Sequence, residues 1–128
     1  VAEHSETISS KGMEPMLFMS WPYKNKPLMM QELRQEFIQA ANKNNILLIP
    51  AGEAFYSFTK AYPDIDLYTR DLRHPSKEGT YLAAAVVFAT IFKTAVEGNH
   101  GIKDIDPEDA LKIQQVADST IREFFKGE

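Results

Sequence analysis

The chain has 128 residues, of which 44% are hydrophobic and 25% are charged, and these proportions are typical of a globular domain and exclude a disordered chain. The net charge of −4, with basic residues scattered along the chain, argues against a nucleic-acid partner, because phosphate binding needs a basic face. The chain has no cysteine, which excludes a disulfide framework, a thiol nucleophile and a cysteine-ligated zinc site.

The length is that of one domain with a hydrophobic core, so we assign residues 1–128 to a single domain. The longest apolar run, Tyr81–Phe92, is too short to cross a bilayer and predicts a core helix, so we expect no membrane span. The sequence begins with Val1 rather than methionine, which we interpret as processing or truncation. The lack of a visible signal peptide therefore leaves the compartment undetermined.

The N-terminal part predicts a helix end followed by a buried strand. Residues 1–12 are polar and read as the end of a helix that Gly12 closes. Met16–Ser20 is a continuous apolar run after a proline, which is typical of a strand buried in a parallel sheet. The aromatic and proline residues of Trp21–Tyr23 then end this strand.

A unit of helix, strand and helix follows. Pro27 opens a helix that runs to about Asn45, with its apolar side chains on one stripe. Ile46–Ile49 predicts a second short buried strand, which Pro50 stops. Gly52–Ala61 has alanine and phenylalanine at helical spacing and predicts another helix.

The C-terminal half predicts one loop and two helices. Residues 62–75 are rich in acidic residues and contain two prolines, which is typical of a loop. Ser76 is a good N-cap for a helix that runs to about Val96. Asp106 can cap a last helix, with Pro107 at its first position.

Strands that alternate with helices predict an α/β fold in which a parallel sheet carries helices on both faces, a three-layer αβα arrangement. Two strands are too few for a stable sheet. We therefore expect the sheet to continue in sequence that precedes this chain, so that the fold is incomplete on its N-terminal side.

Asp71 and His74 form the most informative pair in the chain. A histidine can take a proton from a hydroxyl nucleophile and return it to a leaving group, provided that one ring nitrogen is held by an acceptor. A carboxylate three residues earlier on a turning loop can reach back to hold it. Pro75 restricts His74 to extended geometry, and Gly79 lets another backbone approach the first turn of the following helix.

Two other interpretations of this loop remain open. Asp71 and His74 can form a surface pair that only supports the helix beginning at Ser76. Asp64 and Asp66 are also close in sequence to this pair, which raises a metal site of carboxylate and histidine ligands. Since nothing in the spacing fixes ligand geometry, we expect no metal and no cofactor.

The segment Asp71–Ser76 (DLRHPS), followed by Gly79–Ala84 (GTYLAA), resembles the last conserved block of the SGNH (GDSL-like) hydrolases. The two strands and the turn Pro50–Phe55 are similar to later segments of that fold, so the resemblance covers roughly residues 14–96. It implies a flavodoxin-like α/β fold of which this chain is the C-terminal portion. It also makes a secreted or periplasmic location compatible with the chain.

By this resemblance His74 is the general base and acid of a Ser-His-Asp triad, and Asp71 orients it. The family's nucleophile and oxyanion-hole blocks lie nearer its N-terminus and have no counterpart here: the chain contains no Gly-Asp-Ser, Gly-Asn-Ser or Gly-x-Asn-Asp. We therefore expect the serine to lie outside this chain and the chain alone to be inactive.

Two further residues are candidates for substrate binding. Trp21 follows the first strand, and ligands of open α/β sheets bind outside the carboxyl ends of the strands. An aromatic that covers the core edge is the equally supported alternative. Arg73 flanks the acid–base pair and could meet an anionic substrate, although a solvated arginine is the simpler interpretation.

The first functional hypothesis is an ester hydrolase acting on a small-molecule or carbohydrate ester, with an acyl or acetyl group transferred through an acyl-enzyme. The second is a non-catalytic carbohydrate-binding or interaction module that kept the fold and lost the chemistry. The third is that the chain is one piece of a nicked protein and stays associated with its N-terminal portion as a partner. The intact mass under denaturing conditions distinguishes the third from the others.

Overall fold

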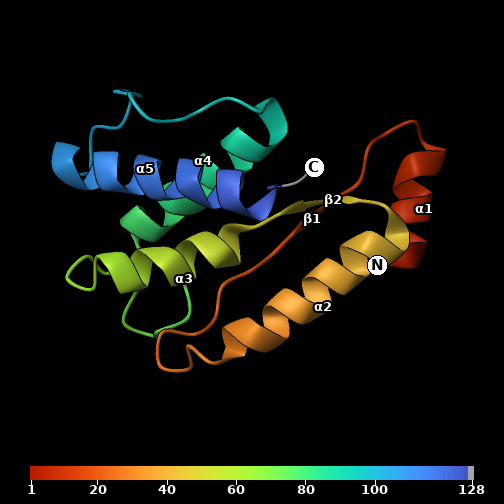
Figure 1. Ribbon diagram of the computed structural model, residues 1–128, viewed down its shortest axis with the longest axis horizontal. Coiled ribbons are helices and arrows are strands. Elements are labelled where there is room, and N and C mark those ends of the chain that lie inside the picture. The colour runs from red at the N-terminus through yellow and green to blue at the C-terminus, as the bar shows by residue number, and fades with distance from the viewer. Residues whose placement is uncertain (127–128) are drawn as a thin grey trace.

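The computed structural model describes residues 1–126, and in this range the chain forms five helices and two strands (Figure 1). In chain order they are α1 (Ala2–Ser10), β1 (Met16–Phe18), α2 (Met29–Asn44), β2 (Leu47–Ile49), α3 (Ala51–Ala61), α4 (Lys77–Phe92) and α5 (Pro107–Phe124). The fold is therefore mixed α/β, as predicted. Helix α1 lies at one end of the molecule, away from α3, α4 and α5 (Figure 1).

The sheet consists of β1 and β2, which pair in parallel and confirm the predicted parallel arrangement. Both strands are shorter than the apolar runs predicted. Beyond Phe18, the Met19 amide still donates to the Ile49 carbonyl at 2.9 Å. The Gly52 amide then donates to the Met19 carbonyl at 3.0 Å, so the chain has already turned into α3.

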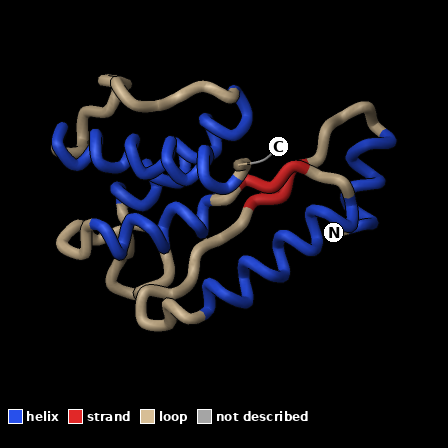
Figure 2. The backbone as a smooth tube through the Cα atoms, in the orientation of Figure 1, coloured by secondary structure: helices blue, strands red, loops and turns tan. Residues whose placement is uncertain are grey.

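The two faces of the sheet contact different helices (Figure 2). Leu17 and Leu48 are partners in the register and pack into a cluster with Met30 and Phe37 of α2. Ile49 faces the other way and joins the larger core. That core is built mainly from α3, α4 and α5, with Phe55, Phe58, Leu82, Val86 and Ile113 among its buried members.

Helix α4 begins as predicted and ends earlier than predicted. The Ser76 hydroxyl accepts from the Gly79 amide at 3.1 Å, which is an N-cap. The helix stops at Phe92 because Lys93 adopts the left-handed conformation, with φ of 52°. Beyond the helix, the amides of Val96, at 2.9 Å, and of Glu97, at 3.0 Å, donate to the buried Asp118 carboxylate of α5. The segment that we predicted as the last turn of the helix is thus bonded to a distant residue instead.

Helix α5 begins at Pro107, and the Asp106 carboxylate accepts from the Glu108 amide at 2.9 Å. Both features of the predicted start are confirmed. In the part of the chain that the structure describes, no helix combines the length and the apolar character needed to span a membrane.

The prediction that β1 is buried is wrong for two of its three residues. Met16 and Phe18 are each 38% exposed, whereas Leu17 between them is partly covered by the α2 cluster. An apolar run specifies that a strand favours burial but does not specify which neighbours are present. Among residues 1–126 the face of β1 opposite α2 is only partly covered, with the Trp21 ring edge-to-face against Phe18 at 6.1 Å between centroids.

Two glycines allow close contact between backbones. A Cβ at Gly79 would lie 2.2 Å from the Leu67 carbonyl oxygen, and one at Gly52 would lie 2.2 Å from the Ser20 carbonyl oxygen. Neither distance is compatible with a side chain. Gly79 therefore has the role predicted for it, and it brings the start of α4 against the loop that carries Asp71 and His74.

We expect Gly79→Ala to destabilise the protein by about 1–3 kcal/mol, because the new methyl group overlaps a backbone oxygen. This loss should outweigh the gain in helix propensity, which favours alanine by about 1 kcal/mol. Urea unfolding checks the value. The control is Gly101→Ala, whose Cβ meets only the flexible Asn99 side chain at 3.2 Å and should change stability by less than about 0.5 kcal/mol. Equal effects of the two changes would contradict the close-approach interpretation.

Candidate active site

The candidate site is a tight turn in the loop between α3 and α4. Tyr68 and Pro75 form an isolated antiparallel bridge. Inside it, the Thr69 amide donates to the His74 carbonyl at 2.9 Å, and the Leu72 amide donates to the Thr69 carbonyl at 3.0 Å. Leu72 adopts a positive φ of 62°, an uncommon conformation for a residue with a side chain. The backbone of residues 69–74 is thereby closed on itself.

The Asp71 carboxylate holds this turn with one oxygen and the histidine with the other. Its Oδ1 accepts from the Thr69 hydroxyl at 2.8 Å, from the Arg73 amide at 2.9 Å and from the His74 amide at 2.9 Å. Its Oδ2 is hydrogen-bonded to the Nδ1 of His74. The carboxylate therefore reaches back to the ring in the way that the spacing predicted.

The same contacts lower the pKa of Asp71 below its ordinary value. The hydrogen bond with the His74 ring is the largest cause, followed by the amides of His74 and Arg73 and the Thr69 hydroxyl. Asp71 is thus ionised at neutral pH. Its side chain is 47% exposed and that of His74 is 78% exposed, so the pair opens to solvent. With Nδ1 turned to Asp71, the Nε2 edge of the ring is the one left for another group.

The loop that follows β1 holds the turn from the opposite side. The Trp21 indole Nε1 donates to the Arg73 carbonyl at 2.9 Å, and the Lys24 amide donates to the Leu72 carbonyl at 2.9 Å. The Tyr68 hydroxyl donates to the Pro22 carbonyl at 2.7 Å. These bonds join segments more than 40 residues apart in sequence and place the turn at the carboxyl end of β1, where open α/β sheets bind ligands.

The base of the loop is fixed by Ser76 and Asp66. The Ser76 hydroxyl donates to the Asp66 carbonyl at 2.8 Å while it caps α4. The Asp66 carboxylate accepts from the Tyr68 amide at 3.0 Å and pairs with the Lys24 ammonium at 2.6 Å, and the Lys24 bond is the main cause of its lowered pKa. Sequence reasoning missed Lys24, because its contact with Asp66 joins residues 42 positions apart.

The predicted substrate-binding residues both lie at the turn. The Trp21 ring stacks on Phe55 with centroids 4.3 Å apart and its Nε1 bonds to the Arg73 carbonyl. Trp21 therefore covers the edge of the core and holds the turn. The Arg73 guanidinium lies over the Tyr23 ring at 4.8 Å, on the exposed side. Contact of Trp21 or Arg73 with a substrate stays a prediction.

A nucleophile is not assembled within residues 1–126, where no serine hydroxyl donates to His74. Ser76, the nearest serine in sequence, is committed to Asp66 and Gly79. In the same range no group of three histidine or carboxylate side chains is arranged to hold a metal ion. Asp64 and Asp66 therefore do not form a metal site with Asp71 and His74.

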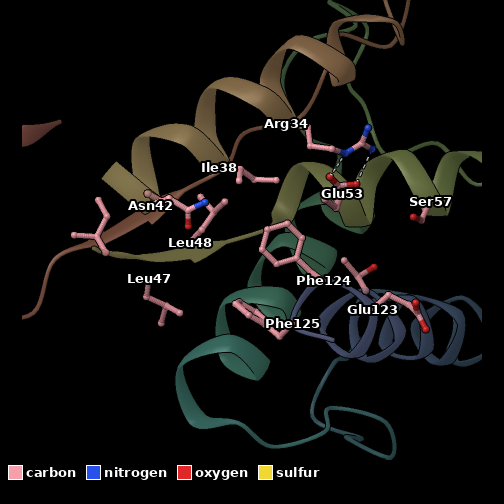
Figure 3. Close-up of a pocket in the computed structure, with 13 residues that line it drawn as sticks. Arg34, Ile38, Asn42, Leu47, Leu48, Glu53, Ser57, Glu123, Phe124 and Phe125 are labelled. Atoms are coloured by element: carbon pink, nitrogen blue, oxygen red, sulfur yellow. Dashed lines mark hydrogen bonds and ion pairs between the residues drawn. The ribbon is translucent and has the colours of Figure 1, made fainter. Parts of the chain in front are cut away.

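A cavity of about 560 Å³ lies elsewhere, between α2, α3 and α5 (Figure 3). Arg34 and Glu53 lie together at one side of it and form a bidentate ion pair, with Nη2 to Oε2 at 2.9 Å. Sequence reasoning assigned no chemistry to Glu53. The residues of the Asp71 turn do not line this cavity, so the acid–base pair and the cavity are separate features.

No protein-family model and no curated protein sequence matches the chain. A similar fold occurs in the crystal structure of a DUF4886 family protein from Bacteroides uniformis, with a TM-score of 0.80 at 21% identity. The match covers 99% of this chain and 55% of that chain, so the present chain spans about half the length of that protein. At this level of identity the likeness concerns the fold alone.

The lowered pKa of Asp71 predicts a pH dependence of stability. Ionised Asp71 stabilises the folded state above its pKa in the unfolded chain, about 3.9, and this contribution is lost as pH falls through the lower pKa of the folded state. Urea unfolding at neutral and acidic pH should therefore show a larger loss on acidification for the natural sequence than for Asp71→Asn. Parallel losses in the two proteins would contradict the pairing.

The Trp21 bond predicts a graded pair of variants. Trp21→Phe keeps an aromatic ring on Phe55 and removes the donor to the Arg73 carbonyl, so we expect a loss of about 0.5–1.5 kcal/mol. Trp21→Ala also removes the stack and should cost about 3–5 kcal/mol. Amide exchange in residues 71–74 should accelerate in Trp21→Phe. Unchanged exchange there would show that the indole does not hold the turn.

Proposed function

We propose that this chain forms the acid–base part of a serine ester hydrolase of the SGNH type. The observation that carries the proposal is the Asp71–His74 pair, in which a carboxylate held by three donors on Oδ1 is bonded through Oδ2 to a histidine ring nitrogen. Support of the following helix alone does not require one carboxylate oxygen to hold the turn and the other to hold the histidine ring. Ser76 already provides the cap of α4.

The chemistry follows from the orientation of the ring. Ionised Asp71 accepts the Nδ1 proton of neutral His74, which leaves the Nε2 lone pair free. Nε2 takes the proton of a serine hydroxyl while the serine oxygen attacks the ester carbonyl, and it then returns that proton to the leaving alcohol. Water repeats the sequence on the acyl-enzyme and releases the acid. The serine and the oxyanion hole would come from residues outside this chain.

The fold supports this assignment in coarse terms. A parallel sheet with the acid–base turn beyond the carboxyl end of β1 is the arrangement in which α/β enzymes bind their substrates. The finer statement, a three-layer flavodoxin-like fold, is part of the proposal. It requires a larger sheet than the two strands found in residues 1–126.

The proposed substrates are acyl or acetyl esters of small molecules or carbohydrates. The side chain of His74 is 78% exposed, which leaves room at the ring for the serine and the substrate. Arg73 and Trp21 flank the ring and are the proposed contacts to such a substrate.

A second candidate is a binding module without catalysis. Both candidates agree with the observation that no serine hydroxyl within residues 1–126 reaches His74; the binding module differs in expecting no serine at His74 from the rest of the protein either. Such a module would bind a carbohydrate or another partner without turnover.

The test is hydrolysis of p-nitrophenyl acetate by the protein expressed from the complete coding sequence that contains this chain. We expect His74→Ala to lower kcat by about 10²–10⁴-fold, because general acid–base catalysis is lost, and Asp71→Asn to lower it by up to about 10⁴-fold. The 128-residue chain alone should give the rate of buffer.

The matched control is His100→Ala, since His100 is exposed and lies in the turn between α4 and α5. Its kcat should equal that of the unmodified protein. Unchanged kcat in a folded His74→Ala variant would rule out the hydrolase mechanism. Saturable binding of an acetylated oligosaccharide without hydrolysis would favour the binding module.

A further inference from the structure

Three groups donate to the Oδ1 atom of Asp71, and the Thr69 hydroxyl is the one side chain among them. It lies 2.8 Å from Oδ1, and the other two donors are the amides of Arg73 and His74 at 2.9 Å. Those amides follow Asp71 by two and three residues along the turn. Thr69 precedes Asp71, so the carboxylate is held from both arms of the turn.

The hydroxyl proton of Thr69 is directed to Asp71 rather than to the nearby backbone. The hydroxyl oxygen also lies 3.3 Å from the His74 carbonyl, but a threonine hydroxyl has a single proton to donate. That carbonyl already accepts from the Thr69 amide at 2.9 Å. Hydrogen bonds to an ionised carboxylate are shorter and stronger than those to a neutral carbonyl, so the proton lies on the 2.8 Å contact with Oδ1.

The backbone at Thr69 is anchored to the core. Thr69 directly follows two buried residues, Leu67 and Tyr68, which are 1% and 7% exposed. The Tyr68 hydroxyl donates to the Pro22 carbonyl at 2.7 Å, which joins this segment to the loop after β1. The hydroxyl of Thr69 therefore reaches Asp71 from backbone that buried side chains hold in place.

This contact restricts the rotation of the Asp71 carboxylate. With Oδ1 bound from both arms of the turn, a rotation of the carboxylate would break three hydrogen bonds, and Oδ2 stays directed to Nδ1 of His74. Without the hydroxyl, Oδ1 keeps only the two amides of the turn. Water can then compete for the carboxylate, because the Asp71 side chain is 47% exposed.

We propose that Thr69 is a positioning residue of the acid–base pair: its hydroxyl fixes the Asp71 carboxylate so that Oδ2 holds Nδ1 of His74 and Nε2 stays free. The inference rests on the function proposed above, in which Nε2 takes and returns the proton of a serine. Thr69 acts through Asp71 and does not bind the substrate. Its loss should therefore lower kcat and leave KM unchanged.

The test compares Thr69→Val with Thr69→Ser in the protein expressed from the complete coding sequence. Valine keeps the branched shape and the preference for extended backbone but has no hydroxyl, whereas serine keeps the hydroxyl. With p-nitrophenyl acetate we expect Thr69→Val to lower kcat about tenfold, which corresponds to the loss of one hydrogen bond to a charged group. Thr69→Ser should keep the original kcat, and KM should be unchanged in both variants.

The matched control is Thr94→Val. Thr94 and Thr69 are both exposed, and the Thr94 hydroxyl donates to a backbone carbonyl, that of Phe92, at 3.1 Å. Its removal should leave kcat unchanged, because Thr94 lies after α4 and does not contact the turn.

A long-range ¹H–¹⁵N spectrum of the same proteins, recorded with the histidine rings neutral, locates the ring proton of His74 independently of turnover. In Thr69→Val we expect the second neutral form, protonated on Nε2, to become detectable. In Thr69→Ser we expect the proton on Nδ1 alone. An unchanged spectrum in Thr69→Val would overturn the inference, as would equal losses of kcat in the two Thr69 variants.

The outcomes distinguish this inference from the proposed function. If His74→Ala lowers kcat and Thr69→Val does not, the hydrolase mechanism stands and the positioning role of Thr69 is overturned. If His74→Ala leaves kcat unchanged, the hydrolase mechanism is wrong, and the spectrum decides by itself whether Thr69 positions the pair.

Discussion

The Asp71 carboxylate accepts hydrogen bonds on both of its oxygens, and the candidate site depends on this division. Oδ1 closes the turn through the Thr69 hydroxyl and two amides, and Oδ2 is bonded to the His74 ring. The group that shapes the backbone is therefore the group that orients the ring. A change at Asp71 would alter the turn and the histidine together, so the conservative Asn substitution is the informative one.

Contacts on two sides of this turn hold its backbone in place. On one side the apolar helix α4 is capped by Ser76 and lies against the loop at Gly79, where no side chain fits. On the other side Trp21 is stacked on the core residue Phe55 and donates to the turn itself. Since His74 remains exposed, these contacts act on the backbone that carries the ring and leave the ring accessible.

The parts of the structure that depend on local chemistry were predictable. The cap at Ser76, the start of α5 at Pro107 and the reach of Asp71 to His74 all follow from spacings of a few residues. The parts that depend on distant partners were not. The Trp21 bond to the turn leaves no pattern in sequence. The segment after α4 is bonded to Asp118 of α5, and the exposure of β1 depends on neighbours that an apolar run does not specify.

The tautomer of His74 is the most direct measure of whether Asp71 prepares it to act as a base. A long-range ¹H–¹⁵N spectrum of the labelled protein, recorded with the histidine rings in their neutral form, reads the two ring nitrogens separately. We predict that His74 carries its proton on Nδ1 and has a bare Nε2, unlike the exposed His4 and His100, and that Asp71→Asn abolishes this difference. A His74 ring protonated on Nε2, or one that exchanges between the two neutral forms, would contradict the assignment.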